Sequence, residues 1–380
     1  MRARTHLRMT AVGLILMIGV AVAPGAAAAK PLDPAARAVI NRIAPTGIGG
    51  GITGVTVGIS DPKLGTTVAS YGTAGIGGRP LTPGMHYRIA SVSKTFTALA
   101  VLRLVAQHKL SLSAPLCRFV PRIPNGCRIT IRQLLAMRAG VYSYTDDQRF
   151  YRDYAHDPLL PGFTPARALA IVRAHRAEAM APGRRTHYSD SNYVLLGYVI
   201  QKVTGQTARR YINGVVTRLG LHHTTFPNRA RLAAPFARGY IGPDSSTGRP
   251  ATTDVTLSNP QVAWTAGAMN STVPDMLRYA HQLGTGAGLS PRLWRLRRQW
   301  TPLTSTGVRL QYGLGLTRLG RWIGHDGSIL GYTDMVFYLP SRHASLVVME
   351  NGADAQTVSS QAVWGEIVKA LYPGTLTQWK

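Results

Sequence analysis

The chain has 380 residues, with 43 Lys and Arg against 16 Asp and Glu, which gives a formal net charge of +27. Such a charge attracts polyanions in general, although a genome with arginine-rich codon usage would produce the same excess. The basic residues are scattered along the chain, without a stripe or interleaved aromatic residues. The composition therefore gives no specific support for a nucleic-acid-binding protein.

The first 29 residues have the layout of a secretory signal peptide. Arg2, Arg4 and Arg8 precede an apolar run at 11–23, and small residues follow at 26–29. The run is shorter than the roughly 20 residues that span a bilayer, which disfavours the alternative of a membrane anchor. We therefore expect an exported protein, secreted or held in the cell envelope, without a stable membrane span. Anionic polymers of the envelope are then the partners that best fit its charge.

Strands are predicted where β-branched residues gather between turn residues, and helices where apolar residues recur with a period near 3.6. In chain order the predicted strands are 52–59, 66–71, 85–89, 334–338 and 344–350, and the last two form a hairpin that closes the chain. The predicted helices are 95–108, 129–137, 165–176, 192–204 and 274–283. Strands at both ends with helices between them predict an α+β fold, with one antiparallel sheet built from both chain ends.

The mature chain, 30–380, is too long for one simple core. We expect one domain with two lobes: an α/β lobe at about 30–115 and 255–380, and a mostly helical lobe at about 116–254. Cys117 and Cys127 lie close together in sequence. In an exported protein they are expected to pair, which would stabilise the fold by about 2–3 kcal/mol. No His or Asn pattern supports a catalytic cysteine.

No metal or cofactor is expected, because none of the eleven His residues has an H-E-x-x-H or H-x-H spacing. Three short blocks instead indicate a serine acyl-transfer site: Ser91-Val92-Ser93-Lys94, Tyr188-Ser189-Asp190 and His325-Asp326-Gly327. Each block also has an ordinary explanation. Ser91 and Asp190 are typical helix caps, and a lone His is usually structural.

The first block stands where a short strand leads into an apolar helix, so Ser91 is predicted in its first turn with Lys94 on the same face. The chain contains two decoys. Ser60 also has a Lys three residues later, but a turn with proline follows it, and Tyr211 begins a Y-x-N pattern inside a helix-like segment. Tyr188 lies in a loop entering a helix, and His325 is expected in a strand near the edge of the sheet.

The stretches 87–98, 188–197 and 324–331 resemble the three signatures of the serine β-lactamase and penicillin-binding protein family. The branch that they resemble holds class C β-lactamases, D-alanyl-D-alanine carboxypeptidases and related esterases. The resemblance covers most of the chain from about residue 50 onward. It implies the β-lactamase/D,D-peptidase fold and a hydrolase without a cofactor.

The resemblance also implies the roles of the residues. Ser91 is the nucleophile, Lys94 its activating partner, and Tyr188 the base or the proton carrier to the leaving group. The backbone N–H groups of Ser91 and Ser328 would form the oxyanion hole. His325 and Gly327 belong to the third signature, where a His favours a peptidase or an esterase over a dedicated β-lactamase.

Two residues depart from the family pattern. Asp190 replaces the usual Asn, and a carboxylate near Lys94 would favour the ammonium form, leaving more of the base role to Tyr188. Asp326 stands where carboxypeptidases often carry the Thr that holds the terminal carboxylate of the substrate. Because like charges repel, Asp326 favours the prediction of an ester or amide substrate that lacks the terminal carboxylate.

The function predicted first is that of an exported D-alanyl-D-alanine carboxypeptidase-like enzyme, which acts on cell-wall peptides through an acyl-enzyme on Ser91. An esterase or a weak β-lactamase using the same site is the second prediction, because the fold does not choose among carbonyl substrates. The third is a protein that binds penicillin or wall peptides without turnover. Each alternative implies a small-molecule or peptide substrate.

Overall fold

The computed structural model describes residues 30–242, 252–303, 310–352 and 359–376. The predicted signal peptide, residues 1–29, lies outside these ranges. Within them, no helix is both long enough and apolar enough to cross a bilayer. Cys117 and Cys127 are joined by a disulfide, as predicted.

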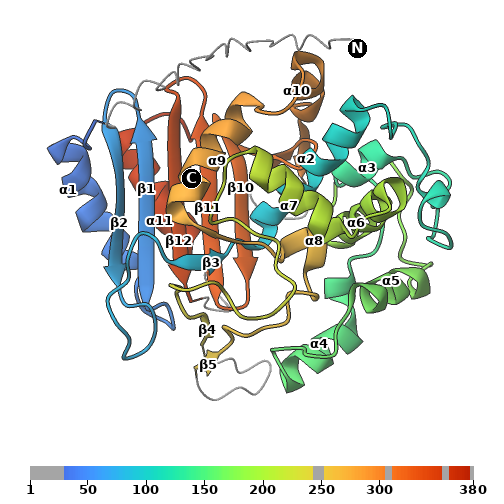
Figure 1. Cartoon of the computed structure of the whole chain (residues 1–380), viewed down its shortest axis with the longest axis horizontal. Coiled ribbons are helices and arrows are strands. Elements are labelled where there is room, and N and C mark those ends of the chain that lie inside the picture. Colours follow the sequence, from blue (N-terminus) through green and yellow to red (C-terminus); the bar gives the residue numbers. More distant parts are fainter. Residues whose placement is uncertain (1–29, 243–251, 304–309, 353–358, 377–380) are drawn as a thin grey trace, which may run out of the picture.

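An eight-stranded antiparallel sheet forms one half of the molecule (Figure 1), with the strand order β2-β1-β12-β11-β10-β9-β8-β7. The hairpin of β1 and β2 joins the C-terminal strands because β1 pairs with β12. This pairing confirms the prediction that both ends of the chain supply one sheet. The strands are β1 (Gly54–Asp61), β2 (Gly65–Gly72), β7 (Thr301–Leu303), β8 (Leu310–Tyr312), β9 (Thr317–Leu319), β10 (Trp322–Ile329), β11 (Tyr332–Leu339) and β12 (Ala344–Asn351).

Every residue of β11 and β12 is buried, so these strands are covered on both faces of the sheet. On one face, β11 and β12 contact α9 (Val273–Thr285). On the other face, α1 (Pro34–Ile43) and α11 (Ser359–Leu371) close a cluster in which Trp322 meets Trp364 edge to face. The sequence analysis ended with a hairpin, and α11, which follows that hairpin, was missed.

The remaining helices gather beside the sheet, on the right in Figure 1. The predicted helices are all present, with ends shifted by a few residues. Helices α4, α8 and α10 were not predicted, and α7 was predicted only as a helix-like segment around Tyr211. The helices are α2 (Ser93–Ala106), α3 (Ile131–Leu135), α4 (Gln148–His156), α5 (Pro165–Ala174), α6 (Ser191–Thr204), α7 (Ala208–Arg218), α8 (Trp264–Gly267) and α10 (Pro291–Arg297).

Helix α2 is the centre of this arrangement. It is buried along nearly its whole length and contacts α6, α7 and α8. A helix that is apolar on all sides is stable only when neighbours surround it. Because α2 is packed on all sides, the residues at its N-terminal end are held on a fixed support. A two-stranded sheet of β3 (His86–Arg88) and β6 (Asn270–Thr272) leads into this end, and β4 (Tyr240–Ile241) pairs with β5 (Thr253–Asp254).

Candidate active site

Ser91 lies in a single 3₁₀ turn, Ala90–Val92, between β3 and α2. The prediction placed Ser91 in the first turn of the helix, whereas α2 begins two residues later. The N-cap of α2 is Val92, and no side chain caps this helix. The Ser91 hydroxyl is therefore not a helix cap, which removes the ordinary explanation for this serine. Ala90 has φ 42°, a left-handed conformation that residues other than Gly, Asn and Asp rarely adopt.

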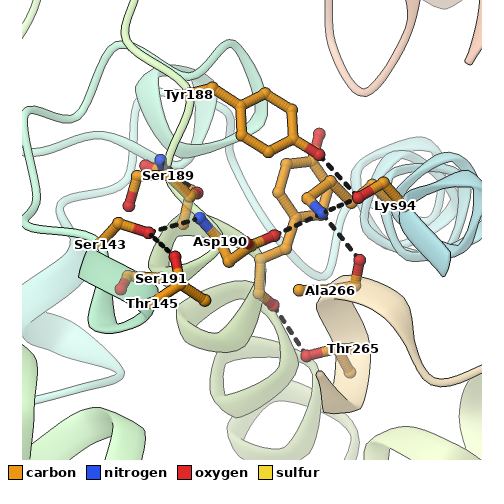
Figure 2. A network of polar contacts seen from close by, with 12 residues as sticks. Lys94, Ser143, Thr145, Tyr188, Ser189, Asp190, Ser191, Thr265 and Ala266 are labelled. Carbon is orange, nitrogen blue, oxygen red and sulfur yellow. Dashed lines mark hydrogen bonds and ion pairs between the residues drawn. The ribbon is translucent and has the colours of Figure 1, made fainter. Parts of the chain in front are cut away.

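Lys94 is completely buried and its ammonium group has three acceptors. Nζ lies 2.8 Å from Ser91 Oγ, 2.8 Å from the carbonyl oxygen of Ala266 and 2.6 Å from Asp190 Oδ1. Three acceptors match the three N–H donors of an ammonium group. The surroundings of Lys94 thus fit a charged side chain that donates to Ser91 rather than a neutral amine that accepts its proton (Figure 2).

Tyr188 reaches Ser91 from the loop before α6. Its hydroxyl donates to Ser91 Oγ over 2.9 Å, and its ring centroid lies 4.9 Å from Lys94 Nζ. Burial raises the pKa of Tyr188 well above its usual value, and the nearby Asp190 carboxylate raises it further, although the hydrogen bond with Ser91 acts in the opposite direction. The resting side chain is therefore a neutral phenol. Residues 91, 94 and 188 converge as the sequence predicted.

The Asp190 side chain does not act as a helix cap. It occupies the N-cap position of α6, but its side chain makes no capping hydrogen bond and pairs instead with Lys94. Ser191 Oγ accepts from the backbone N–H of Tyr144, and the N–H of Asp190 donates to Ser143 Oγ. These contacts tie the loop at 143–145 to the start of α6, so the direction of Asp190 toward Lys94 is fixed by its backbone (Figure 2).

The third block lies on β10, inside the sheet between β9 and β11, and not at the edge of the sheet as predicted. However, β9 pairs only with Trp322, Ile323 and Gly324, so the second half of β10 has a partner on one side only. That open side allows β10 to approach the Ser91 turn. A Cβ atom on Gly327 would lie 2.9 Å from the Ile89 carbonyl oxygen, so glycine permits this approach.

His325 is buried and makes no hydrogen bond to Ser91. Its Nδ1 donates to the Asp326 carbonyl over 2.6 Å, and its Nε2 lies 3.4 Å from the Tyr312 hydroxyl. The rings of Tyr188 and His325 have centroids 6.4 Å apart. His325 therefore supports the Tyr188 side of the site through packed aromatic rings and does not touch the nucleophile.

Asp326 points to the opposite face of the sheet, with its Oδ1 3.4 Å from Nδ1 of the neighbouring His325. Its carboxylate therefore does not face the substrate as predicted. Its cross-strand neighbour Met335 packs in the cluster under α11, and its Oδ2 accepts from Gln361 of that helix. Successive strand residues alternate between the two faces, so a residue next to a site residue points away from the site. Asp326 does not line the cleft around Ser91.

The cleft beside Ser91 has a volume of about 430 Å³. It is lined by the segment 144–160, including Tyr144, Phe150 and Tyr154, by the segment 258–267, and by Ser328 on β10. Two carboxylates, Asp146 and Asp190, line it, and no Arg, Lys or His is among its described lining residues. Burial raises the pKa of Asp146, Asp190 raises it further, and His187 opposes this.

Comparison with known proteins identifies the family. A family model described as Beta-lactamase matches residues 39–364. The chain belongs to the beta-lactamase family. Among solved structures, a D-stereospecific amidohydrolase from Streptomyces sp. is 26% identical with a TM-score of 0.77, covering 89% of this chain and 98% of that one. The D-amino acid amidase from Ochrobactrum anthropi SV3 has the same TM-score at 23% identity, over 88% and 98%.

Two curated relatives from Staphylococcus aureus (strain MRSA252) match a shorter part of this beta-lactamase family chain. Protein flp is 32% identical over 167 residues, and the teichoic acid D-alanine hydrolase is 27% identical over 162 residues. The match covers 42% of this chain in each case, but only 32% and 37% of the length of those relatives. The chain therefore aligns with about a third of each curated relative.

Sequence reasoning missed the walls of the cleft in this beta-lactamase family member. The aromatic residues of 144–154 and Asp146 carry no motif, and α4, which holds Phe150 and Tyr154, was not predicted. The start of α4 could have been predicted from the sequence, because Asp is a favoured N-cap residue. In the structure Asp147 accepts from the N–H groups of Arg149 and Phe150. Among the described residues, no group of three or more His, Cys, Asp or Glu is placed to hold a metal ion.

Proposed function

We propose that the chain is an exported serine hydrolase that forms an acyl-enzyme on Ser91, with an aminoacyl amide or ester as its substrate. The observation that carries this proposal is the pair of donors on one hydroxyl. Ser91 Oγ lies 2.8 Å from Lys94 Nζ and 2.9 Å from the Tyr188 hydroxyl, at the edge of a cleft large enough for a small substrate. A serine so placed can be activated by its neighbours.

Both donors are protonated in the resting site, so attack requires that the cluster first loses one proton. Lys94, Asp190 and Tyr188 together carry no net charge with ammonium, carboxylate and phenol, and loss of a proton from the phenol leaves one negative charge. The phenolate would be stabilised by the Lys94 ammonium near its ring. It then accepts the proton of Ser91 as Oγ bonds to the substrate carbonyl carbon.

The same proton passes from Tyr188 to the leaving nitrogen or oxygen as its bond to the carbonyl carbon breaks. Water then attacks the acyl-enzyme, with Tyr188 taking the proton of the water and returning it to Ser91 Oγ. This assigns Lys94 to charge stabilisation and Tyr188 to proton transfer in both half-reactions, in line with the family resemblance.

The oxyanion formed during attack needs donors that are already in place. Ile329 and Tyr332 close the β10–β11 hairpin across a two-residue turn, so the next pair, Ser328 and Thr333, is of the kind that directs its backbone groups away from the partner strand. The N–H of Ser328 then points from the open side of β10 toward the cleft. Together with the N–H of Ser91 it would form the oxyanion hole, at about 3 kcal/mol for each donor.

The cleft favours a substrate with a positive charge over one with a terminal carboxylate. Asp146 and Asp190 line it, no cation does so among the described residues, and Lys94 is occupied by Asp190. These facts weigh against the carboxypeptidase substrate that the sequence placed first. They support an aminoacyl group with a free ammonium, next to the aromatic wall. The name of one relative, the teichoic acid D-alanine hydrolase, includes such an aminoacyl group.

Replacing Asp190 with Asn is expected to shift the acid limb of the pH profile of kcat/KM to lower pH by about one unit. The Asp190 carboxylate raises the pKa of Tyr188, so its removal lowers that pKa, and the base form is reached at lower pH. The measurement is kcat/KM for both proteins from pH 6 up to the highest pH at which each stays folded, because the pKa of Tyr188 lies above the usual phenol value. An unchanged acid limb would contradict the role assigned to this ion pair.

The acyl-enzyme itself is tested by intact-mass measurement after incubation with a fluorophosphonate or a penicillin. We expect one adduct on the wild-type protein and none on the Ser91→Ala variant. Turnover is then measured on D-alanine p-nitroanilide, a nitrophenyl ester and a D-Ala-D-Ala peptide, with the anilide and the ester expected to be the better substrates. The absence of any adduct would instead favour a protein that binds wall peptides without turnover.

A further inference from the structure

A second pocket, about 530 Å³ in volume, lies beside the loop that carries Tyr188 and outside the catalytic cleft. Its described lining residues have a uniform chemistry: three guanidinium groups and two hydroxyls, with no carboxylate among them. They are Arg138, Arg184, Arg185, Thr186, Thr301 and Pro302. Nothing in the proposed catalytic steps uses this pocket.

The pocket brings together three segments that are distant in sequence. The backbone N–H of Gly183 donates to the Arg138 carbonyl, and that of His187 donates to the Met137 carbonyl, each over 2.8 Å. The hydroxyls of Thr186 and Thr301 are 3.0 Å apart, which ties the loop to strand β7. The loop after α3 and the loop before α6 are thus held against each other by backbone contacts.

The arginines gather here without neutralising partners. In the described ranges of the chain, none of Arg138, Arg184 and Arg185 forms a salt bridge, although Arg138 donates to the Gly183 carbonyl. Neighbouring like charges repel, so such a cluster is stabilised by an anion. Guanidinium groups bind phosphate through paired, charge-assisted hydrogen bonds.

The pocket is linked to the catalytic site through the loop before α6 and through strand β7. Thr186 precedes Tyr188 by two residues, and Thr301 pairs across the strands with Tyr312. The rings of Tyr312 and Tyr188 have centroids 6.2 Å apart. A chain-like ligand with one anionic group at the arginines would therefore reach toward the cleft at Ser91 with its next units.

We propose that the Arg138, Arg184 and Arg185 pocket binds a phosphate group of an anionic polymer that carries the acyl group cleaved at Ser91. The part of this inference that concerns the acyl group rests on the proposed hydrolase function. The binding of phosphate does not depend on that function. No aromatic side chain is among the lining residues that the structure describes, which argues against single-stranded nucleic acid, whose bases stack on such side chains. The ligand is thus a phosphodiester-linked polymer without stacking bases.

The test compares two double variants that remove the same charge. Arg184→Gln/Arg185→Gln removes two exposed arginines of the pocket, and Arg229→Gln/Arg231→Gln removes two exposed arginines that line neither this pocket nor the cleft. Binding of fluorescein-labelled inorganic polyphosphate is measured by fluorescence anisotropy at several salt concentrations. Arg185→Gln alone serves if the pocket double variant does not fold.

The pocket double variant is expected to raise the Kd for polyphosphate at least tenfold. The number of ions released on binding, obtained from the salt dependence of the Kd, is expected to fall by about one to two. The control is expected to raise the Kd less than twofold. Equal losses of polyphosphate affinity in both variants, or no loss in either, would show that the pocket is not the phosphate site. If oligo-dT binds as tightly as polyphosphate and is lost with the same variant, the ligand is nucleic acid and the proposal is wrong.

Fluorophosphonate labelling of Ser91 separates this proposal from the proposed function. The Arg184→Gln/Arg185→Gln variant is expected to label at the wild-type rate, because neither arginine contacts the nucleophile. Polyphosphate binding without labelling of Ser91 would mean that the phosphate site exists and the hydrolase assignment fails. If Ser91 is labelled but the Arg184→Gln/Arg185→Gln variant binds polyphosphate as tightly as the wild type, the hydrolase assignment holds and the phosphate site is wrong.

Discussion

Replacing Lys94 with Met is expected to lower the rate of Ser91 acylation by roughly 10²–10⁴-fold and to reduce the stability of the fold. Met fills a similar volume but cannot donate to Ser91, to the Ala266 carbonyl or to Asp190. Removing one member of a largely buried ion pair leaves the other without compensation, which we expect to cost about 1–3 kcal/mol because Asp190 is partly exposed. The rate of fluorophosphonate labelling and the denaturant midpoint measure the two effects.

A double variant separates the two roles of Lys94. Lys94→Met/Asp190→Asn removes both charges, so its stability is expected to return toward that of the wild type while labelling of Ser91 stays slow. Lys202→Met, on the exposed side of α6, is the control for replacing a lysine. Wild-type labelling of the Lys94→Met protein would remove this residue from the mechanism, whatever its effect on stability.

Replacing Tyr188 with Phe is expected to lower kcat/KM for an amide substrate by roughly 10²–10⁴-fold with little change in Tm. The substitution deletes the hydroxyl that lies 2.9 Å from Ser91 Oγ and keeps the ring that packs near Tyr312 and His325. A leaving amine must take up a proton, whereas nitrophenolate departs without one. The loss should therefore be much larger for the anilide of an amino acid than for its nitrophenyl ester.

Tyr312→Phe is the matched control for this experiment. Its hydroxyl lies 3.4 Å from His325 Nε2 and 3.4 Å from the Tyr193 hydroxyl, with no contact to Ser91 among its described hydrogen bonds. We expect its kcat/KM to fall less than tenfold for both substrates. Equal losses in the two variants, or the same loss of the Tyr188→Phe protein on amide and ester, would show that Tyr188 does not transfer the proton.

The elements with a strong local pattern were predictable. Helix α2 is largely apolar, α6 ends at a glycine with positive φ, and the two hairpins carry β-branched residues on both sides of a turn. The three-residue strands β7 to β9 were missed because so short a segment has no period. Helix α11 was missed although its buried face, Val363, Trp364, Ile367 and Val368, recurs at helical spacing.

The sequence also identified the residues that touch Ser91, because each lies in a short block with a fixed place relative to a helix or a strand. Asp326 shows where this reasoning ends. Its position next to His325 indicated a place in the site, yet strand alternation turns its side chain to the face covered by α11. Asp146, Phe150 and Tyr154 line the cleft without any motif, so only the packing of α4 against the site places them there.

The sequence by itself was enough to predict that Ser91, Lys94 and Tyr188 lie together, that both chain ends share one sheet and that the two cysteines pair, because these follow from contacts along one helix, from strand patterns or from family motifs. The tertiary structure decided which proton state fits Lys94, on which side of β10 each residue lies, and that three arginines from two loops share one pocket. These properties depend on distances between segments far apart in the chain, which no local pattern contains.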